Sequence, residues 1–235
     1  MGFHTTHWTV VLQAKADQGS GAQEALASLC STYWYPLYAF VRRQGSSPPE
    51  AEDLIQEFFC PVLQRQWLVN VSPAAGKFRS FLLACLKNFV TNERERAKTQ
   101  RRGGGRKILP LDGETAETRY ALEPVTRITP EVLFERRWAL ALVERTLGEL
   151  QREYTRAGKG GWFDELQQFL PGGEGNLSRA ELAVKRGVTT GAIDVTVHRL
   201  RQRFGAILRE QVAQTVSSAA EVEEEIRYLM AVLSG

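Results

Sequence analysis

The chain has 235 residues, enough for one large domain or two small ones with buried cores. Hydrophobic residues make up 43% of it and charged residues 24%, which is ordinary for a globular protein. A net charge of +3 is too small to indicate a nucleic-acid partner, so such a partner must be argued from where the charges lie. Because the sequence has neither a secretory signal pattern nor an apolar run of about eighteen residues, we expect a cytoplasmic protein with no membrane contact.

The histidines, cysteines and glycines form no recognisable catalytic or metal site. His4 and His7 have no third ligand or carboxylate cluster beside them. The glycine-rich runs at 103–105 and 172–175 follow no predicted strand and lack the lysine and hydroxyl of a P-loop. The cysteines are far apart and form no CxxC pair, so we expect three reduced thiols packed on helices. These cysteines are Cys30, Cys60 and Cys85. We therefore expect no metal, no cofactor, no small-molecule substrate and no enzymatic activity.

Helical periodicity predicts three helices in the first part of the chain. The first spans 21–41 and contains Pro36, where we expect a kink or a break. The second follows Ser46-Ser47-Pro48-Pro49, a helix-start signal, and runs over 50–67. The third begins near Lys77, and its downstream end is basic. Apolar residues at helical spacing in the last two helices are Leu54, Phe58, Val62, Phe78, Phe81, Leu82, Cys85, Leu86 and Phe89.

A segment without helical periodicity separates these helices from the next ones. Over 108–130 it contains Pro110, Pro124 and Pro130 and its charged residues are mostly acidic, so we expect an extended linker. Helical patterns resume at 131–154, 162–170, 178–186, 190–212 and 221–233. Since no alternating strand pattern occurs, the predicted fold is all-α, with two small helical domains joined by a flexible linker.

The most informative local pattern is a helix-turn-helix over 177–204. Ser178 and Glu181 are spaced as a capping box, and Gly187 suits the left-handed residue that ends a first helix. Thr189 can cap a second helix. The apolar seam of that second helix is Ile193, Val197, Leu200 and Phe204. Its other face has short side chains first and arginines further along, which is typical of a recognition helix. A plain helical hairpin with a solvated basic face fits the same pattern.

The motifs stand in a particular order along the chain. AEDLIQEFF at 51–59 is followed by KFRSFLLA at 77–84, then by Asn88 and a basic run, and finally by the helix-turn-helix with HRLR at 198–201. This order and spacing resemble regions 2 and 4 of the extracytoplasmic-function (ECF) subfamily of bacterial RNA polymerase sigma factors. The resemblance covers roughly residues 21–212 and leaves a C-terminal extension.

The resemblance implies a division of the chain into five parts. These are an N-terminal arm (1–20), a region 2-like domain (21–107), the acidic linker (108–130), a region 4-like domain (131–212) and an amphipathic extension (213–235). The linker would thread the polymerase channels near the RNA path, although a solvated spacer explains its composition equally well. The extension can pack on the protein itself, cover a DNA-binding face until polymerase binds, or bind another partner. We favour packing on the protein.

The resemblance also implies partners and sites. Core RNA polymerase and promoter DNA are the expected partners, with an anti-sigma factor as a further candidate. Polymerase-binding residues would be Asp53, Gln56 and Glu57. Residues that contact the −10 DNA would be Lys77, Arg79, Asn88, Asn92, Arg94 and Arg96. Residues that contact the −35 DNA would be Thr189, Thr190, Gly191, Asp194, Val195, His198, Arg199, Arg201 and Arg203.

Two residues depart from the family pattern. Asp194 and Val195 stand where family members often carry a basic and a small polar residue. Asp194 can accept a hydrogen bond from a cytosine amino group, but it repels phosphates, so the −35 sequence stays open. Two alternatives also remain. A stand-alone helix-turn-helix regulator would explain residues 177–204 but would assign no function to residues 50–102. An anti-sigma or adaptor protein would have only part of the sigma-factor fold.

Overall fold

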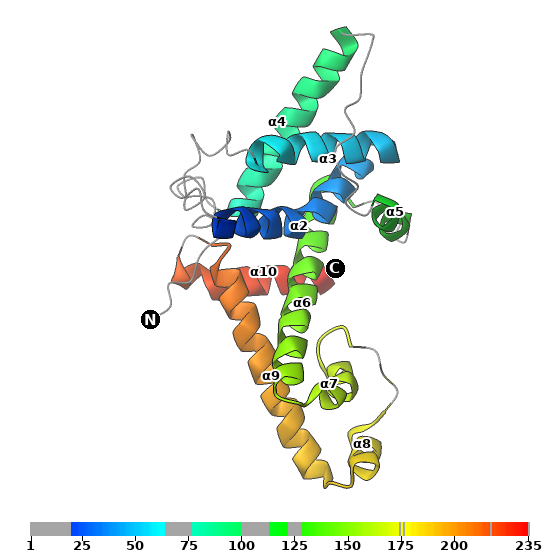
Figure 1. The fold of residues 1–235 in the computed structure, drawn as a ribbon, viewed down its shortest axis with the longest axis vertical. Helices are drawn as coiled ribbons and strands as arrows, with labels where there is room; N and C mark the ends of the chain where they lie inside the picture. The colour runs from blue at the N-terminus through cyan, green and yellow to red at the C-terminus, as the bar shows by residue number, and fades with distance from the viewer. Residues whose placement is uncertain are drawn as a thin grey trace. The chain divides into compact units, whose positions relative to one another are not determined.

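The structure is a computed structural model that describes residues 20–63, 77–99, 113–121, 128–173, 175, 177–216 and 218–234. Every regular element in these ranges is a helix, which confirms the all-α prediction (Figure 1). None of the helices in the described part of the chain is both long enough and apolar enough to cross a bilayer.

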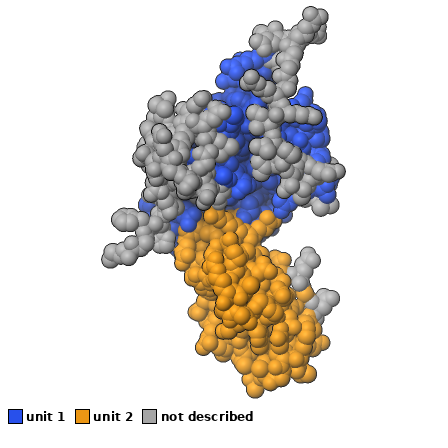
Figure 2. Space-filling view, viewed as in Figure 1, with its two compact units in different colours: residues 1–141, 212–235 blue, residues 142–211 orange. Residues whose placement is uncertain are grey.

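The chain divides into two compact units (Figure 2). Unit 1 consists of Met1–Ala141 and Val212–Gly235, and unit 2 of Leu142–Gln211. The predicted division differs, because it grouped 131–141 with the helix-turn-helix and set 213–235 apart as an extension. In the structure, the first half of helix α6 and the C-terminal helix both belong to unit 1.

Unit 1 is built from helices at both ends of the chain. They are α2 (Ser20–Arg43), α3 (Pro48–Leu63), α4 (Phe78–Thr99), α5 (Gly113–Ala121), the first half of α6 (Pro130–Arg156), η4 (Ala219–Glu221) and α10 (Val222–Ser234). Aromatic side chains join three of them in the core. The Tyr33 ring of α2 lies 5.6 Å from that of Phe78 on α4 and 6.4 Å from that of Trp138 on α6. Burial of such rings supplies much of the stabilising free energy of a small helical unit.

The turn between α2 and α3 has the residues that its geometry needs. Gly45 has φ +92°, a backbone conformation that favours glycine. Pro48 takes the first position of α3, and Glu50 accepts hydrogen bonds from the Ser47 backbone N–H (2.8 Å) and hydroxyl (2.9 Å). The start signal in the sequence is therefore confirmed. A kink or a break of the helix was expected at Pro36. The break is wrong, because α2 continues to Arg43.

The buried face of α3 differs in part from the expected one. Phe58 is buried as predicted, but Leu54 is only half-buried, and the other core positions are Ala51, Ile55 and Phe59. The side chain of Val62 lies outside the described residues. On α4 the expected face is confirmed in Phe78, Leu82 and Leu86, which are all buried, while Phe81, Cys85 and Phe89 are half-buried.

The expectation of an extended linker is wrong for residues 113–121, which form α5. Glu117 of α5 accepts hydrogen bonds from Arg42 Nε (2.9 Å) and Nη2 (2.8 Å) and from the Tyr38 hydroxyl (2.6 Å). These contacts, together with the buried Ala116, attach α5 to α2. A helix held by ion pairs leaves no apolar stripe in the sequence, which is why periodicity did not predict it.

Unit 2 contains the rest of α6, α7 (Gly160–Leu166), η3 (Gln167–Phe169), α8 (Arg179–Arg186) and most of α9 (Thr190–Ala213). These helices share one buried apolar cluster. An ion-pair cluster joins α7 to α8, in which Glu165 lies 2.8 Å from Lys185 Nζ and 2.5 Å from Arg186 Nε. Arg186 also stacks on the Trp162 ring at 4.8 Å.

Candidate nucleic-acid interface

The helix-turn-helix in unit 2 has all the local contacts that the sequence predicts. Ser178 Oγ accepts from the Glu181 N–H at 3.2 Å, and the Glu181 carboxylate accepts from the Ser178 N–H at 2.7 Å, so the capping box is complete. Gly187 ends α8 with φ +65°. Thr189 Oγ1 accepts from the Ala192 N–H at 3.2 Å and caps α9. Both helix ends at the turn are thus specified locally.

Apolar packing holds α9 against α8. The predicted seam of Ile193, Val197, Leu200 and Phe204 is buried, as are Leu182 and Ala183 of α8. The small Ala183 side chain, 3% exposed, lies in the apolar cluster that α8 shares with α9. Burial of the seam fixes which face of α9 points to solvent.

The residues expected to contact −35 DNA are all exposed. They are Thr189, Thr190, Gly191, Asp194, Val195, His198, Arg199, Arg201 and Arg203. Val195 is 50% exposed, so its side chain is accessible from solvent. The first two turns of α9 therefore present short side chains and one apolar surface to solvent, a composition that can approach base edges.

Asp194 has a cationic partner that sequence reasoning missed. Arg179, the first residue of α8, places Nη1 2.8 Å from Asp194 Oδ1. Its guanidinium also lies 5.7 Å from the centre of the Phe169 ring. Arg179 partly neutralises the aspartate, which reduces the repulsion that a lone carboxylate would exert on phosphates. The pairing depends on the crossing of α8 and α9, so no local sequence signal predicts it.

The residues expected to contact −10 DNA do not form one cluster in unit 1. Asn88, Asn92 and Arg96 are exposed and follow one another at steps of four along α4, so they share one face. Arg94 points elsewhere, since its Nη2 lies 3.3 Å from Ser46 Oγ in the α2–α3 turn. The structure thus brings together three of the six predicted residues.

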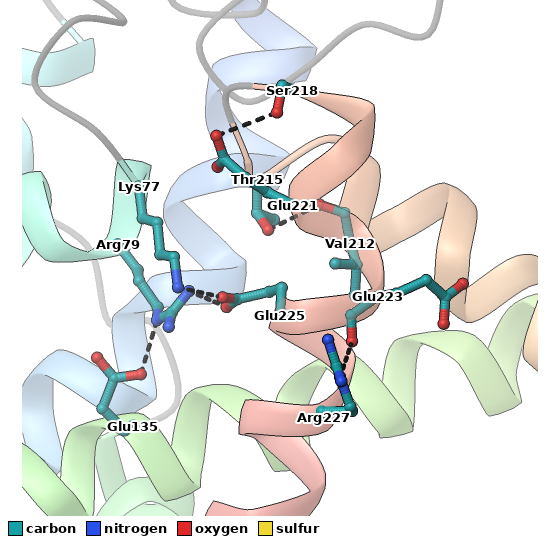
Figure 3. Close-up of polar contacts among 10 residues, drawn as sticks. All are labelled: Lys77, Arg79, Glu135, Val212, Thr215, Ser218, Glu221, Glu223, Glu225 and Arg227. Carbon is teal, nitrogen blue, oxygen red and sulfur yellow. Dashed lines mark hydrogen bonds and ion pairs between the residues drawn. The ribbon is translucent and has the colours of Figure 1, made fainter.

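Lys77 and Arg79, at the start of α4, are engaged by carboxylates (Figure 3). The Arg79 side chain is 3% exposed; it donates to Glu135 of α6 at 2.6 Å and also to Glu225 of α10. Lys77 Nζ lies 2.6 Å from Glu225 Oε2. The expected DNA contact of Arg79 stays a prediction: in this conformation its guanidinium lies in a buried ion-pair network, so a contact with DNA would require these ion pairs to open.

An open acidic cavity lies where polymerase-binding residues were expected. Its volume is about 510 Å³, and Asp53 and Glu57 of α3 line it together with Glu50, Glu93 and Arg94. Partial burial, followed by the carboxylates of Glu93 and Asp53, raises the pKa of Glu57. Gln56 is half-buried and does not line the cavity. The site therefore contains Glu50 and Glu93, which the sequence pattern did not single out, and its excess of negative charge suits a basic partner.

No protein family, no curated protein and no solved structure matches this chain. Within the described residues, no group of three or more histidine, cysteine, aspartate or glutamate side chains could hold a metal ion. The features of the chain that bear on its function are therefore the helix-turn-helix of unit 2 and the charged surfaces of unit 1.

Proposed function

We propose that this chain is an RNA polymerase sigma factor of the ECF type, which binds core polymerase and directs promoter-specific initiation. The observation that carries the proposal is the capped helix-turn-helix whose second helix, α9, keeps its short N-terminal side chains exposed. A buried seam on the opposite face orients this surface outward. Such an arrangement is how a recognition helix enters a major groove.

The chemistry of α9 supports a mixed base and phosphate surface. Gly191 allows close approach of the backbone, and Val195 offers an apolar contact for a thymine methyl group. Arg179 neutralises Asp194 in part. Because the Asp194 side chain is 49% exposed, its carboxylate can also accept a hydrogen bond from a cytosine amino group. Arg199 and Arg201 further along supply cations for phosphates.

Unit 1 supports the other half of the proposal. The acidic cavity beside α3 is a suitable docking surface for a basic helix of the polymerase, and its charged lining residues suit a reversible interface. The exposed face with Asn88, Asn92 and Arg96 offers amides and a cation to a single-stranded −10 element. A stand-alone regulator would need neither surface.

The test is binding of the purified chain to core RNA polymerase, followed by transcription from a randomised promoter library. Recovery of a stable complex and enrichment of a two-part promoter is the expected result. Duplex binding through α9 without polymerase binding would instead identify a stand-alone regulator. Polymerase binding without any promoter enrichment would identify an adaptor or anti-sigma protein.

A charge reversal in the acidic cavity gives a sharper prediction. Asp53→Arg should weaken binding to core polymerase about ten-fold or more, because like charges placed opposite each other at an interface cost a few kcal/mol. Glu52→Arg is the matched control, since it makes the same charge change one residue away and does not line the cavity. Binding is measured by fluorescence anisotropy of the labelled chain. Equal affinities of the two folded variants would remove the cavity from the interface.

A further inference from the structure

The C-terminal helix α10 contributes a buried carboxylate to unit 1 (Figure 3). Glu225 is fully buried, although glutamate seldom is unless it is paired. Its two carboxylate oxygens contact Arg79 Nη1 and Lys77 Nζ, the second at 2.6 Å. The network contains two cations and two carboxylates, Glu225 and Glu135, so removal of Glu225 would leave it with a net positive charge.

Aromatic rings complete the enclosure of these cations. The Arg79 guanidinium lies 4.6 Å from the centre of the Trp138 ring and 5.3 Å from that of Tyr228. Lys77 Nζ lies 5.5 Å from the same Tyr228 ring. Since Tyr228 and Glu225 are three residues apart on α10, one helix supplies both an anion and an aromatic surface to the cations of α4.

The attachment of α10 is incomplete further along the helix. An open, mainly apolar cavity of about 350 Å³ lies among α4, α6 and α10, with Leu83, Val132 and Val232 in its lining. Tyr228 and Met230 are 41% and 47% exposed. Apolar surface left unfilled contributes no packing energy, so the attachment of α10 relies strongly on Glu225 and on the buried Val222 and Leu229.

We infer that Glu225 occupies a cationic site for a DNA phosphate, so that α10 inhibits DNA binding by unit 1 until it is displaced. The inference rests on the proposed function, because that proposal gives α4 a role in binding single-stranded DNA, and it extends this role to the cations at the start of the helix. Arginine and lysine bind carboxylates and phosphates through the same charge-assisted hydrogen bonds. Lys77 and Arg79 also flank the N-terminus of a 22-residue helix, where the helix dipole favours an anion. Lys77, 34% exposed, gives the site a route to solvent.

The experiment uses the full-length chain and a short fluorescein-labelled oligo-dT as the probe. Glu225→Gln removes the charge and keeps the shape of the side chain, and Glu224→Gln is the control because Glu224 is exposed on the same helix. We expect Glu225→Gln to raise affinity roughly five- to hundred-fold, the usual range for coupling between two sites. The dependence of log affinity on log salt should steepen by about 0.7 for each cation released to a phosphate. Glu224→Gln should change neither quantity.

A second substitution shows whether the gain comes from the proposed site. In the Glu225→Gln background, Lys77→Gln should abolish the gain, whereas Lys87→Gln, elsewhere on α4, should leave it intact. If the Glu225→Gln variant does not unfold cooperatively, Tyr228→Ala replaces it in the experiment, since this substitution weakens the packing of α10 without changing a charge. Unchanged oligo-dT affinity in the folded variant, or a gain that survives Lys77→Gln, would overturn the inference.

Parallel measurement of core polymerase binding separates the two proposals. If the chain binds polymerase but Glu225→Gln does not raise its affinity for oligo-dT, the proposed function stands and the inhibitory role of α10 is wrong. If Glu225→Gln raises the affinity for oligo-dT through Lys77 but the chain binds no polymerase, the inhibitory contact stands and the sigma proposal is wrong.

Discussion

Arg201 and Arg203 stand two residues apart on α9 but make different contacts within unit 2. Two steps of the helix separate their side chains by about 200° around its axis. Arg203 donates from Nε (2.9 Å) and Nη2 (2.6 Å) to the Glu153 carboxylate, whereas Arg201 donates from Nε to the Phe169 carbonyl at 2.9 Å. A move of Arg203 to a phosphate would break an ion pair. Arg201 is therefore the better candidate for a phosphate contact.

This difference predicts unequal effects of two similar substitutions. Arg201→Ala should weaken binding to a selected promoter duplex and reduce the slope of log affinity against log salt by about 1, because one phosphate contact is lost. Arg203→Ala should leave the slope near that of the original protein. It should lower the free energy of unfolding by less than about 1 kcal/mol, as for a surface ion pair. Anisotropy across a salt series measures the slopes, and equal losses in both variants would contradict the assignment.

Glu165 makes the stability of unit 2 depend on pH. Hydrogen bonds from Lys185, then Arg186, hold the pKa of Glu165 below its ordinary value of 4.5. Because the folded state favours the carboxylate, this contribution is fully present above pH 4.5 and is lost as the pH falls through the lowered pKa. Glu165→Gln should therefore destabilise unit 2 at neutral pH by less than about 1 kcal/mol, and the difference should shrink below pH 4.5.

Urea unfolding at neutral and acidic pH measures the effect of Glu165→Gln. Asp164→Asn is the control, because it removes one carboxylate from the adjacent residue, whose side chain is exposed. If Glu165→Gln lowers the free energy of unfolding by the same amount at both pH values, the ion-pair cluster is not the source of the loss.

Among the elements, those defined by local contacts could be predicted and those defined by distant contacts could not. The capping box at Ser178 and the left-handed Gly187 involve neighbours in the chain, so the bounds of α8 and α9 followed from the sequence. By contrast, Glu117 binds Arg42, 75 residues away, and Glu225 binds Arg79, 146 residues away. A single ion pair between distant segments produces no periodicity. Hence neither the docking of α5 nor the burial of Arg79 was visible before the structure.

The two glycines beside the turn between α8 and α9 give a matched pair of predictions. Gly187→Ala should destabilise unit 2 by about 1 kcal/mol or somewhat more, because alanine is strained at φ +65°. Gly191→Ala should stabilise α9 by less than about 1 kcal/mol, since nothing lies within 4 Å of the added methyl group. It should nevertheless weaken duplex binding, because the methyl group lies on the exposed face of α9. Thermal unfolding and duplex anisotropy measure both effects, and unchanged affinity of Gly191→Ala would take that residue out of the interface.

At the scale of the whole molecule, the division into units runs through continuous helices. Helix α6 extends from Pro130 to Arg156 without interruption, but Leu133, Phe134 and Trp138 are buried in unit 1 and Leu150 in unit 2. The apolar period is the same in both halves of the helix. Periodicity shows that a residue is buried but not which core buries it, so the predicted boundary at 131 and the observed one at 142 differ.

The position of this boundary can be tested with two fragments. A fragment of residues 142–211 contains the whole buried cluster of unit 2, and we expect a monomer that unfolds cooperatively. A fragment of 131–212 adds Leu133, Phe134 and Trp138 but not their core partners on α2 and α4, so it should self-associate and bind a hydrophobic dye. Substitution of those three residues by serine should restore the monomer without changing its unfolding temperature, as size-exclusion chromatography and circular dichroism would show. If the longer fragment is instead monomeric and more stable, residues 131–141 pack on the core of unit 2, and the boundary predicted from the sequence is the better one.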